Sequence, residues 1–213
     1  MVATFRANRP EAGPHLATLA RMTALPRWPP RLLTVTEFAV LDEAADGRYE
    51  LQEGHVVVAP RPEPAHGAYL SGLLAQLDAQ TPDHLSIVPE VRVDLALVAP
   101  TRPGFVRVPD LVVVTTAGLD LRRRNSGLVP AGEVVLAVEI VSEGSRRTDH
   151  AVKHAEYGDA GIPHYWIVDI DVRPSLVACH HAGEFGYADA PPVTGRFTTD
   201  RPFPVRLDLD RLT

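Results

Sequence analysis

The stretches "VPDLVVV", residues 108–114, and "LAVEIVS", residues 136–142, each place one acid in an apolar run. Short runs of valine, leucine and isoleucine are typical of buried β-strands. A carboxylate is costly to bury without a partner, so packing alone does not explain Asp110 and Glu139. The fold and a candidate site both follow from the position of these two acids.

Each acid has a defined place on its predicted strand. Pro109 lacks a backbone donor and favours a strand start or an edge, so we expect Asp110 where its strand begins. Glu139 should point to the face opposite Val138 and Ile140. Two carboxylates on neighbouring strands repel each other unless a cation lies between them, and Mg²⁺ accepts such ligands. The alternative is an acid at a strand end paired with an arginine.

The rest of the chain supplies the elements of an α/β fold. The patterns predict a short helix over 33–44, a β-hairpin over 46–60, a helix over 62–80, strands over 85–97, 104–114, 133–142 and 164–169, a loop over 122–132 and a helix over 148–161. This order predicts a central mixed β-sheet flanked by helices, with an N-terminal β-hairpin. We predict a variable segment over 1–30 and a single domain over 31–213. Translation starts at Met1 or at Met22.

Composition narrows the class of protein. A net charge of −6 argues against a dedicated duplex-DNA binder, so any DNA contact must use local basic patches or metal ions. With 6% aromatic residues, a stacking platform for single strands is disfavoured. No apolar stretch approaches the roughly 18 residues of a membrane span, so we expect no membrane partner. The single cysteine, Cys179, and the interrupted N-terminal pattern favour a cytoplasmic protein.

The helix that follows the Glu139 strand carries a candidate lysine. Asp149, Lys153 and Tyr157 are four residues apart and share one helical face. Lys153 lies one turn into the helix and could reach back toward the two acids, where it would stabilise charge on a scissile phosphate. The alternative is a solvated ion pair between Asp149 and Lys153.

Three further residues bear on a site. Glu50, in "RYELQEG", is a third acid that could bind metal or water, and the alternative is an exposed edge residue. Arg146 and Arg147 follow the Glu139 strand, so they are candidates for phosphate contacts or simply solvated loop residues.

Competing zinc and thiol motifs are incomplete. His150 and His154 have the spacing of a zinc protease, but Ala151 stands where such enzymes carry their catalytic glutamate. We interpret both as helix-surface histidines. Cys179 lacks a CxxC partner.

Together these segments resemble a known family. A "PD" on one strand and an acid on the next are similar to the motif of the PD-(D/E)XK nuclease superfamily. The segments "GRYELQEGHVVVAP", "HGAYLSGLLAQL", "VPDLVVV", "LAVEIVS" and "RRTDHAVKHAEYGDAGIPHYWIVD" resemble the Uma-two family of restriction endonucleases, over about residues 33–180. The resemblance implies a restriction-endonuclease-like core with Asp110 and Glu139 as Mg²⁺ ligands and Glu50 as an auxiliary acid.

The resemblance also implies a displaced lysine. Val141 stands where the usual motif has lysine, whereas family members carry a lysine on the following helix that matches Lys153. Our leading hypothesis is a Mg²⁺-dependent endonuclease acting on DNA, with Mn²⁺ as a substitute ion. Asp110, Glu139 and the carbonyl of Ile140 would hold the metal, and Lys153 would stabilise the phosphate.

Two other classes stay open. A non-catalytic binding or assembly protein that keeps the nuclease fold is the main alternative, and the acidic net charge favours it. A carboxylate-pair hydrolase acting on sugars is disfavoured by the scarce aromatic residues. For a nuclease, the two-fold symmetry of duplex DNA favours a homodimer.

Overall fold

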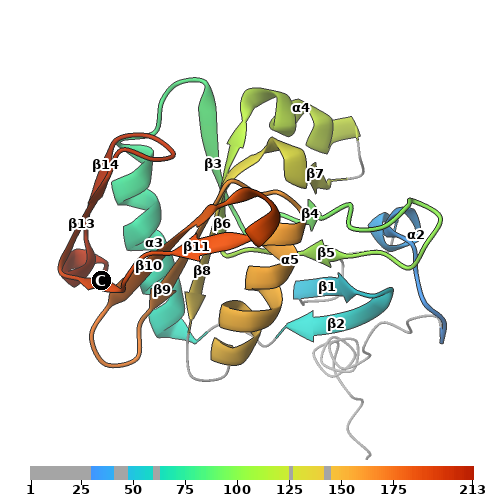
Figure 1. The fold of residues 1–213 in the computed structure, drawn as a ribbon, viewed down its shortest axis with the longest axis horizontal. Helices are drawn as coiled ribbons and strands as arrows, with labels where there is room; N and C mark the ends of the chain where they lie inside the picture. Colours follow the sequence, from blue (N-terminus) through green and yellow to red (C-terminus); the bar gives the residue numbers. More distant parts are fainter. Residues whose placement is uncertain (1–29, 41–47, 60–62, 125–126, 142–144) are drawn as a thin grey trace, which may run out of the picture.

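The computed structural model describes residues 30–40, 48–59, 63–124, 127–141 and 145–213. Two mixed β-sheets meet in the described part of the chain (Figure 1). The larger sheet consists, in spatial order, of β11 (Tyr187–Asp189), β10 (Ser175–His181), β9 (His164–Asp169), β8 (Val134–Val141), β6 (Leu111–Thr115) and β3 (Leu85–Pro89), with β12 (Val193–Thr194) paired to β10. The α/β class and the central mixed sheet are confirmed.

The smaller sheet contains the predicted hairpin. Its spatial order is β2 (His55–Ala59), β1 (Arg48–Gln52), β5 (Val106–Arg107), β4 (Val93–Asp94) and β7 (Val129–Pro130). The turn between β1 and β2 consists of Glu53 and Gly54, both with positive φ, 51° and 79°. Two positive φ values give the turn the twist that a tight hairpin needs, so the hairpin is confirmed.

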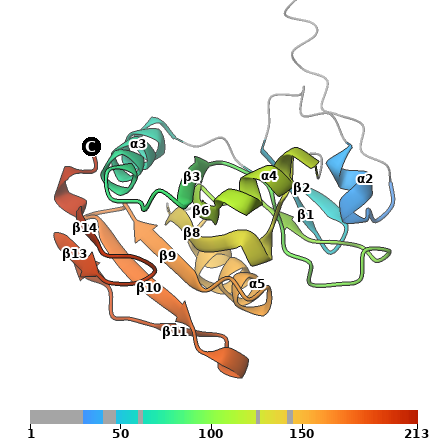
Figure 2. The same ribbon diagram turned by 90° about the horizontal axis from the view of Figure 1, so that it is seen from above.

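Helices cover both faces of the larger sheet. The described helical segments are α2 (Val35–Ala39), α3 (Pro64–Asp78), α4 (Thr116–Arg124), a π-helical stretch Thr148–Lys153 and α5 (His154–Asp159). Figure 2 shows α3 on one face of this sheet, together with the two-stranded sheet of β13 (Arg196–Thr199) and β14 (Val205–Asp208), and α5 on the other face. None of the described helices is long and apolar enough to cross a membrane.

The alternation along β8 assigns its side chains to these two faces. Val138 and Ile140 belong to the core that α3 and β13–β14 cover, together with Leu73 and Leu77 of α3. Glu139 therefore points to the α5 face, as the strand pattern predicts.

Two predicted strands are each divided between the sheets. The prediction of one strand over 85–97 is wrong, because β3 ends at Pro89 and Glu90 adopts a positive φ of 49° that turns the chain into the smaller sheet. The strand predicted over 104–114 is likewise divided, since Pro109 offers no donor to extend the ladder. A hydrogen bond of 3.1 Å from the Glu90 amide to the Asp110 carbonyl joins the two points where the chain passes from one sheet to the other. Asp110 thus lies at the junction of the two sheets.

The loop predicted over 122–132 is also wrong in part. Residues 122–124 form the last turn of α4, and β7 begins at Val129 after four intervening residues; residues 125–126 lie outside the described part of the chain. Arginine has high helix propensity, and positive charge at a helix C-terminus interacts favourably with the helix dipole.

Candidate active site

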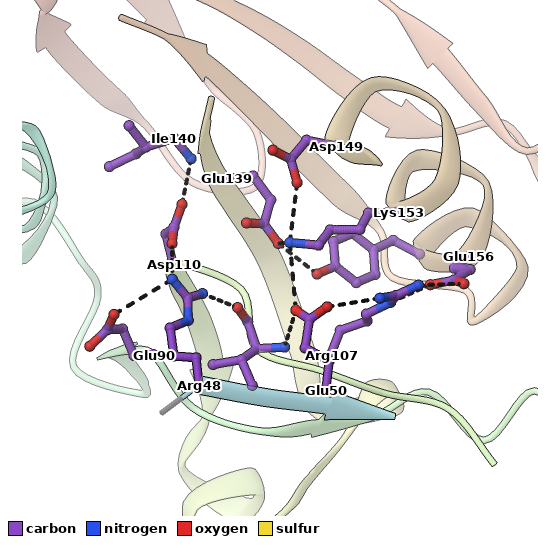
Figure 3. Close-up of polar contacts among 12 residues, drawn as sticks. Arg48, Glu50, Glu90, Arg107, Asp110, Glu139, Ile140, Asp149, Lys153 and Glu156 are labelled. Atoms are coloured by element: carbon purple, nitrogen blue, oxygen red, sulfur yellow. Dashed lines mark hydrogen bonds and ion pairs between the residues drawn. The ribbon is translucent and has the colours of Figure 1, made fainter. Parts of the chain in front are cut away.

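Asp110 accepts hydrogen bonds from two different parts of the chain and lies close to a third. Its Oδ2 accepts from the Ile140 amide at 2.7 Å, and its Oδ1 accepts from Arg48 Nη1 at 2.7 Å (Figure 3). His66 Nε2 lies 3.2 Å from Oδ1, although its orientation is too poor for a hydrogen bond. Burial alone would raise the pKa of Asp110. The nearby His66 side chain and the positive charge of Arg48 outweigh burial and lower this pKa to about 2. Asp110 is therefore a carboxylate at neutral pH.

Glu139 is the centre of a second buried cluster. Its Oε1 accepts from the Tyr157 hydroxyl at 2.8 Å and from Lys153 Nζ at 2.9 Å. Lys153 Nζ also lies 3.1 Å from Asp149 Oδ1 and 3.6 Å from Glu50 Oε1 (Figure 3). The shared helical face and the approach of Lys153 to Glu139 are confirmed. The Asp149–Lys153 ion pair also forms, but it is buried with Glu139 rather than solvated.

The backbone around Lys153 explains how the amine enters the site. Residues Thr148–Lys153 adopt π-helical geometry and lead directly into α5. Short π-helical segments recur at functional sites, because the widened turn displaces side chains from their regular helical positions. Both Asp149 and Lys153 are buried there.

Glu50 is 5% exposed, so its alternative assignment as an exposed edge residue is wrong. Its Oε1 accepts from the Val108 amide at 3.1 Å, and its Oε2 accepts from Arg107 Nη1 at 2.8 Å. Arg107 in turn donates to Glu156 at 2.6 and 2.8 Å. These bonds connect β1, β5 and α5 beneath the site.

Four residues of this cluster were not predicted from the sequence: Arg48, His66, Arg107 and Glu156. A detectable pattern existed for one of them, because Arg107 lies between two valines in "FVRVPD" as Glu139 lies between apolar neighbours. The same criterion of a charge within an apolar strand could have identified it. Arg48 and Glu156 are ordinary charged residues in their local sequence, and only their partners distinguish them.

The proposed backbone ligand lies beside Asp110. The Ile140 amide points to Asp110. In an extended strand the N–H and C=O groups of one residue point to the same side, so the Ile140 carbonyl also faces the Asp110 side. Arg146 contacts Asp169 and Asp171, so a phosphate would have to compete with two carboxylates for its guanidinium. Arg147 is exposed. Phosphate contact by either arginine stays a prediction.

The cluster carries more negative than positive charge. Five buried or largely buried carboxylates face three cations, which leaves a formal excess of two negative charges when all are ionised; the groups are Glu50, Asp110, Glu139, Asp149 and Glu156 with Arg48, Arg107 and Lys153. The exposed Glu90, 3.6 Å from Arg48, adds to this excess. Burial, and then the charges of neighbouring acids, raise the pKa of Glu139 to about 8 despite the pairing with Lys153. Burial would lower the pKa of Lys153, but the charges of Glu139, Glu50 and Asp149 raise it, so Lys153 stays an ammonium. A bound divalent cation would offset this excess and favour the ionised form of Glu139.

Comparison with known proteins identifies the family of this chain. A family model described as "Uma2: Putative restriction endonuclease" matches residues 35–209. The chain belongs to the Uma2 family. A crystal structure described as that of "a putative nuclease belonging to DUF820", from Anabaena variabilis, has a similar fold, with a TM-score of 0.61 and 17% identity over 84% of this chain and 97% of that chain. No match was found among curated proteins.

The donor set of this Uma2 chain fits a hard divalent ion. Asp110, Glu139 and the Ile140 carbonyl offer only oxygen atoms, which Mg²⁺ prefers. Val141, at the usual lysine position, is fully buried in the core on the α5 face. The ammonium comes instead from Lys153, which contacts Glu139 from the helix.

The raised pKa of Glu139 predicts how stability depends on pH in the metal-free Uma2 protein. Between its ordinary value of 4.5 and about 8, the folded protein holds a proton that the unfolded chain has released. Stability should therefore fall as pH rises through this window. Glu139→Gln cannot ionise, so the Tm of the variant should rise relative to wild type by several degrees between pH 5 and 8, since about 1 kcal/mol moves Tm by roughly 2–4 °C. Thermal unfolding in a chelator measures this, and parallel pH profiles for the two proteins would contradict the raised pKa.

Proposed function

We propose that the protein is a Mg²⁺-dependent endonuclease that hydrolyses phosphodiester bonds in DNA, with Mn²⁺ as a substitute ion. The observation that carries the proposal is the convergence of Asp110, Glu139 and Lys153 at the sheet junction in a cluster with excess negative charge. Membership of a family described as restriction endonucleases supports it. A purely structural ion-pair cluster would not require unbalanced buried acids.

The metal ligands would be the carboxylates of Asp110 and Glu139 and the Ile140 carbonyl. When bound there, a divalent ion neutralises charge on the phosphate and lowers the pKa of a coordinated water. Asp110 is held in place by the Ile140 amide and Arg48, and Glu139 is oriented by the Tyr157 hydroxyl. Such bonds keep ligands aligned without the metal.

Lys153 would stabilise the charge that develops on the scissile phosphate. Its ammonium is adjacent to Glu139 and is positioned by Asp149 and Glu50. A fixed cation in a buried, low-dielectric site stabilises such charge more strongly than one in water. Glu50 therefore acts on the reaction through Lys153, and Arg107 positions Glu50.

The charge of the protein also affects how it would bind DNA. The net charge of −6 makes broad attraction of DNA weak, so phosphate contact would depend on the metal and on local cations such as Arg146 and Arg147. A homodimer would place two such sites across a duplex with matching two-fold symmetry. We expect the protein to act in the cytoplasm.

A non-catalytic binding protein is the second candidate. The observation that favours it is that Lys153 already contacts three carboxylates and Asp110 already pairs with Arg48, so each reactive group has a partner without metal. Such a protein would bind a divalent ion without turnover. Metal titration by calorimetry together with a cleavage assay separates the two candidates.

Purified protein should nick supercoiled plasmid DNA in the presence of Mn²⁺ or Mg²⁺, and a chelator should stop the reaction. Glu139→Ala, purified in parallel, should lose the activity because it lacks one ligand. Gel analysis of relaxed plasmid measures the rate. Equal nicking by wild type and Glu139→Ala would show that a contaminating nuclease is responsible, and metal binding without nicking would favour the binding protein.

A further inference from the structure

A separate group of potential ligands lies on the α5 face of the larger sheet. Cys179 of β10 and Asp189 of β11 are directly opposite each other in the antiparallel register, and His154 is the first residue of α5. Figures 1 and 2 show β11 beside α5. One ligand atom from each residue lies within 4.8 Å of the other two, and His154 Nε2 is 2.8 Å from Asp189 Oδ1. A nitrogen, a sulfur and an oxygen donor therefore converge from three elements.

The two helix histidines do not act together. His150 is exposed, whereas His154 contacts Asp189. The interpretation as helix-surface histidines thus holds for His150, while the His154 side chain is only 23% exposed.

A catalytic cysteine does not explain the group. Nucleophilic thiols are accessible and have a lowered pKa. Cys179 is 1% exposed, and burial together with the nearby Asp189 carboxylate raises the pKa of its thiol. His154 directs its Nε2 at Asp189, 2.8 Å away, rather than at the thiol, so the base needed to activate a nucleophile is not in place.

We propose that His154, Cys179 and Asp189 bind one Zn²⁺ ion, with a fourth position left for water. Zinc accepts imidazole, thiolate and carboxylate ligands in tetrahedral geometry, with bonds of about 2.0–2.3 Å. Tetrahedral ligand atoms then lie about 3.2–3.6 Å apart. Since the present separations are at most 4.8 Å, movements of about 1 Å complete the site, and the half-exposed Asp189 side chain is free to make them.

The surroundings hold the ligands in place and connect them to the active site. The His154 ring packs edge-on against Tyr187 at 5.2 Å and Tyr165 at 6.2 Å between centroids. A metal here would tie the β10–β11 hairpin to the start of α5, one residue after Lys153. The thiolate ligand makes the site unsuitable for Mg²⁺, which prefers oxygen. The zinc site is therefore independent of the proposed magnesium site.

Zinc binding to chelator-treated protein tests the proposal. All proteins carry Glu139→Gln, so that zinc binding at the proposed magnesium site is weakened. We expect one zinc per chain after gel filtration, and a rise in Tm of about 5–10 °C at a free zinc concentration about 100 times the Kd. Cobalt in place of zinc should give a near-ultraviolet thiolate charge-transfer band.

Two site variants and one control complete the experiment. Cys179→Ser should remove the cobalt band. Asp189→Asn, at an exposed position that tolerates substitution, should weaken zinc binding at least about tenfold. Even substitutions of residues that only orient a metal ligand reduce metal affinity about 10–100-fold, so loss of a direct ligand should reach at least the lower end of this range. His150→Ala, on the same helix, should bind zinc like the parent. The proposal is overturned if the parent retains no zinc, if Cys179→Ser and Asp189→Asn both bind it unchanged, or if His150→Ala abolishes binding.

Discussion

Replacing Lys153 with methionine should lower the rate of metal-dependent DNA nicking by about 10²–10³, because a lost electrostatic stabiliser of the transition state has an effect of this size. Methionine keeps most of the apolar stem and removes only the ammonium. Glu139, Asp149 and Glu50 then lose their shared cation, so metal-free stability should fall by roughly 3–5 kcal/mol. Metal affinity should be retained or increased, because the site becomes more negative.

A lower nicking rate together with retained metal affinity distinguishes a catalytic lysine from a structural one. Nicking is measured under saturating metal and below the Tm of the variant, so that unfolding does not contribute to the rate. Lys153→Arg, which keeps the charge with a different shape, should nick faster than Lys153→Met. If Lys153→Met is folded, binds metal and nicks at the wild-type rate, then the lysine only balances buried charge.

Asp110→Asn should weaken Mg²⁺ or Mn²⁺ binding by at least about 100-fold, since even second-shell substitutions at metal sites reach 10–100-fold. Asparagine is nearly the same shape, but it carries no charge and has one acceptor oxygen. It therefore cannot accept from both the Ile140 amide and Arg48 as the carboxylate does. Nicking should fall in parallel with metal occupancy.

Calorimetric titration measures this affinity, and Asp83→Asn provides a matched control at an exposed aspartate. The control should bind metal like wild type. Equal metal affinity in Asp110→Asn and wild type would place the metal elsewhere. Since Asp110→Asn leaves Arg48 without its charged partner, the titration needs a parallel measurement of Tm to show that the variant is folded.

Much of the framework follows from local sequence patterns. The hairpin, the long helix over most of 62–80 and the buried strand β8 are set by hydrophobic periodicity and turn residues within short windows. The same patterns identified Asp110, Glu139 and the helical face of Lys153, because an acid within an apolar run and a spacing of four are local features. Strand division at Glu90 escaped prediction, since alternation continues across that break, whereas Pro109 had already indicated a strand start beside Asp110.

Charge pairing was decided only by the tertiary structure. Arg48 and Asp110 are 62 residues apart, and Arg107 is 57 and 49 residues from Glu50 and Glu156. No local pattern encodes such partners, because they meet only where the two sheets join.

By itself, the sequence determined the α/β elements of this protein and the acids and lysine on their faces, since each depends on neighbours within a few residues. The tertiary structure alone decided that Glu50 is buried, that Lys153 contacts three carboxylates and that His154 meets Cys179 and Asp189. The physical reason is that burial and electrostatic coupling depend on distances in space, which the packing of the helix and sheets sets.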